Sequence, residues 1–219
     1  TSARVRNLIS QQDGIKAAFY GFQDRYRALP GDYATADQNI QMTTTGASAN
    51  GNGNGRIDAP PAVPGATEHI LVWEHLSKSG FINGNYVFGA SIADATTPKN
   101  PYGQYVQLAY DATYAVPSGT AIQRHNLKTG NQIPVEIVAE VDRKFDDRTG
   151  PTGSCVFAAF SATGTAPSAP AAARREGHDP LDGLAGEGHL RGGGCGHERG
   201  GPEREHRAAA DGGSVGLCL

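Results

Sequence analysis

Several features that mark particular classes of protein are scarce or missing in this sequence. Its 219 residues include only three cysteines, Cys155, Cys195 and Cys218, and none is in a CxxC spacing, which argues against a cysteine zinc site or a thioredoxin-like redox pair. The given sequence has no run of the roughly 18 consecutive apolar residues that a membrane-spanning helix needs. The formal net charge is only -3, so no electrostatic bias predicts nucleic acid as a partner.

Motifs for catalysis are missing as well. The chain has no GxSxG, HExxH or P-loop sequence, and no order of Ser, His and Asp suggests a catalytic triad. We therefore expect no enzyme activity. His69 and His75 are expected to be exposed helix residues and not a metal pair, whereas Trp73 is expected in the core.

The clearest pattern that is present lies at the start of the chain. Apolar residues recur there mostly at helical spacing, at Val5, Leu8, Ile9, Ile15, Phe19, Phe22, Tyr26 and Leu29. This stripe predicts an amphipathic helix within residues 1–29. Pro30, Gly31 and Asp32 end it, because proline cannot continue the hydrogen-bond ladder.

The middle of the chain alternates between loop, helix and strand signals. Residues 43–64 form a Gly- and Asn-rich surface loop, and a short second helix is expected from Thr67 to Ser79, with Gly80 as its cap. Strands are expected within 102–114 and 122–127, because apolar residues such as Val106, Leu108 and Tyr110 alternate with other side chains. Pro134 opens a third helix, and residues 154–160 read as the last strand. We expect an α+β fold with a small antiparallel sheet.

The last part of the chain does not follow these patterns. At 219 residues the chain fits one domain with a tail, and we expect the domain to cover residues 1–160. Residues 161–219 are rich in Gly, Ala, Arg and His and have little to bury. Two explanations stay open for this tail: it is disordered, or it derives from a frameshift in a GC-rich gene.

Four stretches of the chain together resemble one family of bacterial proteins. They are ARVRNLISQQDGIKAAFYGFQDRYRALPGDY (3–33), GNGNGRI (51–57), WEHLSKSGFINGNY (73–86) and VDRKFDDRTGPTGS (141–154). In this order and spacing the sequence resembles proteins with a prepilin-type N-terminal cleavage and methylation signal, the type IV pilins and type II secretion pseudopilins. The GFTLIEL-type processing signal of that family is absent from the given sequence, which begins at Thr1 and looks truncated or processed.

The resemblance implies a pilin-like fold and a function in filament assembly. It implies a long first helix packed on the sheet, whose missing upstream half anchors the chain in the inner membrane and later forms the filament core. The domain would lie in the periplasm before assembly and on a pilus or the cell surface afterwards, with other pilin or pseudopilin subunits as partners and a possible part in cell adhesion. The expected assembly surface is the stripe of Val5, Leu8, Ile9, Ile15, Phe19 and Phe22. Cys155 is the candidate for a disulfide, with its partner left open.

A second possibility is a soluble periplasmic binding module with the same fold. The order of Asn50, Asn52, Asn54 and Asp58 imitates the first half of a calcium-binding loop. Asparagines replace the early aspartates, and Pro61 stands where a closing glutamate is expected, so the charge is low for tight binding. Because of this partial match, calcium is the one cofactor that the sequence suggests, and no other is expected.

Overall fold

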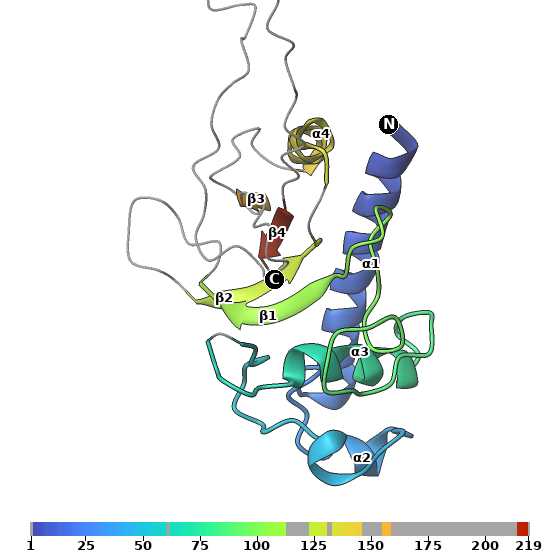
Figure 1. The fold of residues 1–219 in the computed structure, drawn as a ribbon. Coiled ribbons are helices and arrows are strands. Elements are labelled where there is room, and N and C mark those ends of the chain that lie inside the picture. Colours follow the sequence, from blue (N-terminus) through green and yellow to red (C-terminus); the bar gives the residue numbers. More distant parts are fainter. Residues whose placement is uncertain are drawn as a thin grey trace, which may run out of the picture. The chain divides into compact units, whose positions relative to one another are not determined.

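The fold combines a long first helix, shorter helices and a small antiparallel sheet (Figure 1). The computed structural model describes residues 2–60, 62–112, 123–130, 133–145, 155–158 and 214–218. Within these ranges the elements follow in this order: α1 (Ser2–Tyr26), α2 (Ala36–Asn39), a 3-10 turn (Gly46–Ser48), α3 (Glu68–Lys78), β1 (Gln107–Asp111), β2 (Arg124–Lys128), α4 (Val135–Phe145), β3 (Cys155–Ala158) and β4 (Ser214–Cys218). The expected α+β class is consistent with this arrangement.

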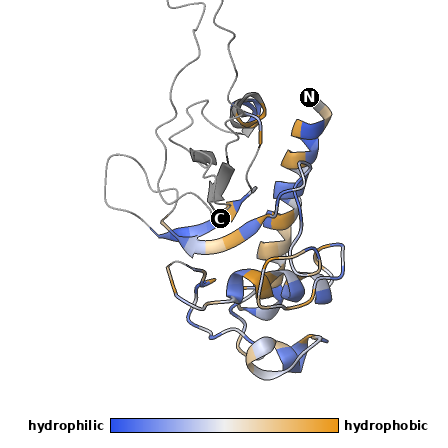
Figure 2. Ribbon diagram, viewed as in Figure 1, coloured by the Kyte–Doolittle hydropathy of each residue, from blue (hydrophilic) through white to orange (hydrophobic). Residues whose placement is uncertain are grey.

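Helix α1 confirms the first prediction but ends three residues before position 29. Arg27 has a φ of 54°, in the left-handed region that interrupts a right-handed helix, so the helix stops before Pro30 is reached. Apolar residues are interspersed with polar ones along α1, as expected for an amphipathic helix (Figure 2). No helix in the described ranges is both long and apolar enough to cross a membrane.

The described strands form one antiparallel sheet in the order β1-β2-β4-β3. Leu108 on β1 lies opposite Leu127 on β2, and Cys155 on β3 lies opposite Leu217 on β4. Strand β4 comes from the last residues of the predicted tail, and the sequence analysis did not expect it. Its five residues, Ser214–Cys218, are too few for their alternation to stand out in a glycine-rich stretch. Residues 161–213 lie outside the described part of the chain.

Two groups of buried apolar side chains hold α1 to the other elements. Its second half packs in a cluster that includes Trp73 of α3, Leu108 of β1 and Leu127 of β2. The start of α1 packs in another cluster with residues at and before α4. Burial of these apolar side chains holds α1 in place, because an amphipathic helix without tertiary packing is only marginally stable in water.

Two other predicted helices and the loop also appear in the structure. Helix α3 ends next to Gly80, whose φ of 81° provides the left-handed cap that glycine favours, and α4 follows Pro134 as expected. The loop predicted at 43–64 does not lie wholly on the surface. Ile57 and Ala59 are buried within it, because Ile57 joins the cluster beneath α1.

Candidate functional site

The residues predicted as an assembly surface lie on the inner face of α1. Five of them are no more than 6 % exposed, and the sixth is half-buried; in chain order the six are Val5, Leu8, Ile9, Ile15, Phe19 and Phe22. A side chain surrounded by its own domain cannot contact another subunit unless the core opens. This placement therefore corrects the prediction: the stripe holds α1 to its own domain, and the face left for a partner is the outer one.

The outer face of α1 carries small, polar and charged side chains, among them Arg6 and Asp13. Its exposed positions at helical spacing are Ala3, Asn7, Ser10, Gly14 and Ala17. A Cβ at Gly14 would have no atom within 4 Å, so this part of the helix surface is open. Tyr20 follows with 45 % exposure, and its ring meets Phe19 edge-on.

Asp32, in the turn after α1, fixes the Asn-Gly part of the loop. Its Oδ1 accepts the N–H of Asn54 at 2.9 Å, and its Oδ2 accepts the N–H of Gly55 at 2.7 Å. Its main-chain oxygen accepts the N–H of Gly53 at 3.0 Å. The two segments pass so closely that a Cβ on Gly51 would lie 2.3 Å from the Asp32 Cα, so only glycine fits there. Burial raises the pKa of Asp32, although the N–H groups that it accepts act in the opposite direction.

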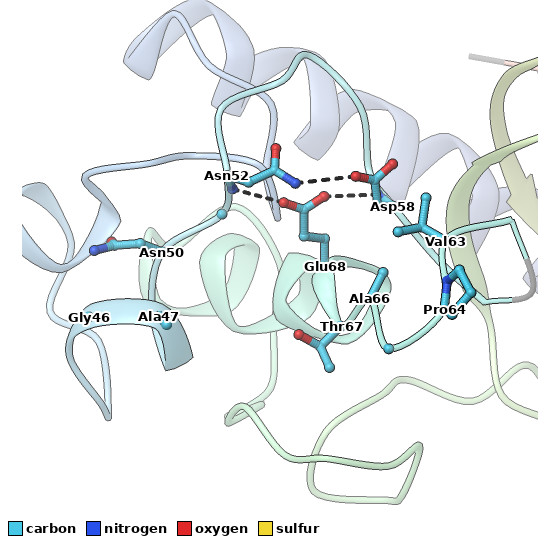
Figure 3. A pocket seen from close by; sticks show the side chains of 12 residues that line it. Gly46, Ala47, Asn50, Asn52, Asp58, Val63, Pro64, Ala66, Thr67 and Glu68 are labelled. Carbon is cyan, nitrogen blue, oxygen red and sulfur yellow. Dashed lines mark hydrogen bonds between the residues drawn. The ribbon is translucent and has the colours of Figure 1, made fainter.

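Glu68 and Asp58 complete the polar network on the other side of the loop (Figure 3). Glu68, the first residue of α3, accepts the N–H of Asn52 on Oε1 and the N–H of Asp58 on Oε2, both at 2.9 Å. Asp58 Oδ2 accepts the side-chain amides of Asn52 at 3.2 Å and of Asn54 at 2.8 Å. Burial raises the pKa of Glu68, and the charges of Asp32 and Asp58 add to this effect. An open pocket of about 530 Å³ lies beside these residues.

The predicted calcium ligands come together only in part. Asn52 and Asn54 meet at Asp58, whereas the side-chain oxygen of Asn50 turns away to accept the N–H of Asp37 at 3.0 Å. The two amides present N–H donors to Asp58, while a calcium ion requires oxygen. Their oxygens already accept main-chain N–H groups within the loop.

Calcium binding would therefore require both amides to turn and the loop to lose those bonds. In the described part of the chain, no three His, Cys, Asp or Glu side chains are placed to hold a metal ion. The calcium site stays a prediction.

Two histidine side chains also form hydrogen bonds with main-chain groups in the loop or just before it. His75 Nδ1 accepts the N–H of Gly31 at 2.9 Å, and its Nε2 lies 2.8 Å from the oxygen of Ala49, so the ring is neutral with its proton on Nε2. Burial lowers the pKa of His75 to about 4. His125 Nε2 accepts the N–H of Ile57 at 3.3 Å, and burial lowers its pKa too. Protonation of either acceptor would turn it into a donor facing another N–H.

Helix α3 supplies a further anchor through Glu74, which is fully buried. Its Oε1 accepts the N–H of Thr43 at 2.8 Å, and its Oε2 accepts the N–H of Phe88 at 2.7 Å. The prediction that His69 and His75 are exposed is wrong: both are buried, because α3 is covered on nearly all sides. The expected core position of Trp73 is confirmed.

The sequence does not show that these acidic residues and main-chain N–H groups form one network. In the sequence, Asp32 reads as a helix stop, and no motif marks Glu68 and Glu74 of α3 as its partners. The available signal was the run of apolar residues between Glu68 and Glu74, which is too long for one face of a surface helix. Charged residues in such a run must find partners when the helix is buried.

The disulfide prediction cannot be followed to its side chain. Cys155 begins β3 opposite Leu217, but its side chain and Cys195 lie outside the described residues.

The chain matches no known family model, no curated protein and no solved structure.

Proposed function

We propose that this chain is a structural subunit of a type IV pilus or a type II secretion pseudopilus and acts by assembly, not by catalysis. Its partners are other pilin or pseudopilin subunits. It is anchored in the inner membrane by a segment upstream of α1, with the described domain in the periplasm, and reaches the pilus or cell surface when the filament grows. The pilin-like fold is part of the same proposal.

The observation that carries this proposal is the position of α1. The helix has 25 residues, and its apolar face is buried from Val5 to Phe22 against the sheet, α3 and α4. A long first helix packed on a small antiparallel sheet is the arrangement that the resemblance to pilins implies. The four stretches that resemble the pilin family add support, because the first of them supplies α1 and the third begins in α3.

The coding sequence upstream of Thr1 gives the first test. A prepilin is expected to encode a glycine at the processing site, followed by an apolar segment with a glutamate at its fifth position. A conventional signal peptide directly before Thr1 would contradict the filament function.

Contact between copies is tested with a photoreactive phenylalanine derivative in the cells that produce the chain. We would place it at Tyr20 on the outer face of α1 and, as a control of similar exposure, at Ile92; these side chains are 45 % and 40 % exposed. Sheared surface filaments should contain the chain and show a ladder of crosslinked copies from position 20, stronger than from position 92. Absence of the chain from sheared filaments would overturn the proposal.

One observation favours the second candidate, a soluble periplasmic binding module, for which calcium dependence is a separate hypothesis. The open pocket of about 530 Å³ borders both the asparagine loop and the start of α3, where a small ligand has room. Only the calcium-dependent form of this candidate requires that calcium stabilise the loop. Calcium titration tests that form, whereas the coding sequence upstream of Thr1 separates the binding module from the filament subunit.

A further inference from the structure

The chain contains four Asn-Gly pairs, which share the same chemistry and differ in their surroundings. They are Asn50-Gly51, Asn52-Gly53, Asn54-Gly55 and Asn83-Gly84. In such a pair the main-chain nitrogen of glycine can attack the Cγ atom of asparagine, since no side chain hinders its approach. The side-chain nitrogen leaves as ammonia, and a five-membered succinimide forms. Water then opens the succinimide to aspartate or isoaspartate, so the reaction needs no oxidant, reductant or other reactant.

In three of the pairs the attacking nitrogen is already engaged in a hydrogen bond. The N–H of Gly51 donates to the oxygen of Tyr33 at 3.0 Å, and the N–H of Gly53 donates to the oxygen of Asp32 at 3.0 Å. The N–H of Gly55 donates to the Asp32 carboxylate at 2.7 Å. All three glycine nitrogens are therefore tied to the segment that follows α1.

The asparagine side chains of these pairs are held as well. The Asn50 oxygen accepts the N–H of Asp37, and Asn52 and Asn54 both donate to Asp58. The reaction requires Cγ to turn towards the next nitrogen, so at least two hydrogen bonds must open together at each pair. The loop must therefore open locally before it can react.

The fourth pair has none of these restraints. Asn83 and Gly84 are exposed in the turn after α3 and, within the described part of the chain, neither the Asn83 side chain nor the Gly84 N–H has a hydrogen-bond partner. Gly84 has a φ of 115°, a region open to glycine and strained for other residues. We propose that Asn83 is the site at which this protein deamidates, and that the hydrogen bonds described above keep the other three Asn-Gly pairs unreactive while the chain is folded. Tyr33 and Asp37 hold the first pair, whereas Asp32 and Asp58 hold the second and third.

The four pairs provide their own controls in one experiment. The full-length protein is incubated in mildly alkaline buffer, digested in acid after increasing times, and analysed by mass spectrometry for the change from amide to carboxylate. Position 83 should convert at least about tenfold faster than positions 50, 52 and 54, because each hydrogen bond that must open lowers the reactive population by roughly fivefold. In urea the four rates should agree within about threefold, because glycine follows each asparagine and the fold no longer protects any pair.

Two results would overturn the inference. One is a loop asparagine that converts as fast as position 83 in the folded protein. The other is a lead of position 83 that persists unchanged in urea, since its cause would then be the local sequence and not the fold. Asn83→Gln, which cannot readily form the five-membered ring, should remove the fast reaction without changing the slow ones.

A substitution in the network tests the protection directly. Asp32→Ala removes both carboxylate bonds to the Asn54-Gly55 segment but leaves the Tyr33 oxygen that accepts from Gly51. Conversion at position 54 should rise at least about fivefold more than conversion at position 50. An equal rise at both positions, or no rise at position 54, contradicts the proposed role of Asp32. Asp24→Ala removes an exposed carboxylate of α1 and should leave all four rates unchanged.

Discussion

Helix α1 and the loop of residues 50–58 are held in place by opposite kinds of interaction. The helix depends on apolar side chains that are buried on one face, and this attraction has no preferred direction. The loop depends on carboxylates and on His125, which accept individual main-chain N–H groups. The first kind is visible as a sequence period, while the second depends on the position of single atoms. The two regions should therefore respond differently to substitution and to pH.

The largest effect is expected from the apolar side. Phe22→Ala would leave a cavity in a fully buried cluster and should lower the free energy of unfolding by about 3–5 kcal/mol. Urea denaturation of the full chain measures this loss. Tyr20→Ala, on the outer face of the same helix, should change stability by less than about 1 kcal/mol. Equal losses from the two variants would contradict the burial pattern.

The next-largest effect is the pH dependence of stability that His75 causes. The pKa of His75 is about 4 in the folded chain against its ordinary value of 6.5, so the unfolded chain binds the proton more readily. The stability that neutral His75 contributes is present above pH 6.5 and is lost as the pH falls towards 4, by about 3 kcal/mol in total. Asp32 and Glu68 act in the opposite direction, because their raised pKa values favour proton uptake by the folded chain.

A comparison with His75→Gln isolates the histidine, since both proteins carry the same carboxylates. The difference in free energy of unfolding between the two proteins should shrink as the pH falls from 6.5 to 4. Denaturant titrations at several pH values measure it. A difference that stays constant would mean that His75 does not titrate as an acceptor for Gly31.

A smaller effect is expected from a nearly isosteric change in the loop network. Asp32→Asn turns one acceptor of a main-chain N–H into a donor and should cost about 1–3 kcal/mol. Hydrogen exchange should accelerate at the amides of Asn54 and Gly55, while amides in α1 stay protected. Asp24→Asn, in an exposed pair with Arg27, should change stability by less than about 1 kcal/mol. If exchange in the loop does not change, the Asp32 carboxylate does not hold it.

Calcium should have the smallest effect. The amides of Asn52 and Asn54 direct N–H groups at Asp58, so millimolar calcium should raise the free energy of unfolding by less than about 0.5 kcal/mol. Isothermal titration with the parent chain and with Asn54→Ala gives the direct measurement. Saturable heat in the parent that disappears in the variant would instead support the calcium-dependent binding module.

The sequence could predict the elements because their signals are periodic. The spacing of Leu8, Ile15, Phe19 and Phe22 indicated α1, and glycine at position 80 indicated the end of α3. It could not predict which partner each face meets, since an apolar stripe looks the same whether it packs on its own domain or on a neighbour. The pattern thus fits an assembly surface equally well, whereas α1 buries the stripe inside its own domain.

The loop network was beyond sequence reasoning for a different reason. Asp32, Glu68 and His125 are far apart in the chain, and each binds a main-chain N–H that has no signature of its own. In the sequence, the asparagines of the loop look like oxygen donors for a metal. In the structure their amide nitrogens face Asp58, and only coordinates could distinguish these two orientations.

The bond between the loop and β1 limits how copies of this chain can associate. Strand β1 ends the described sheet, and the N–H of Tyr110 points away from β2 to the oxygen of Ile57 at 2.8 Å. That bond engages one main-chain N–H of the sheet edge at which a strand from another molecule could be added. Loosening residues 50–58 would free this N–H, so we expect it to favour pairing of β1 with a strand from another molecule.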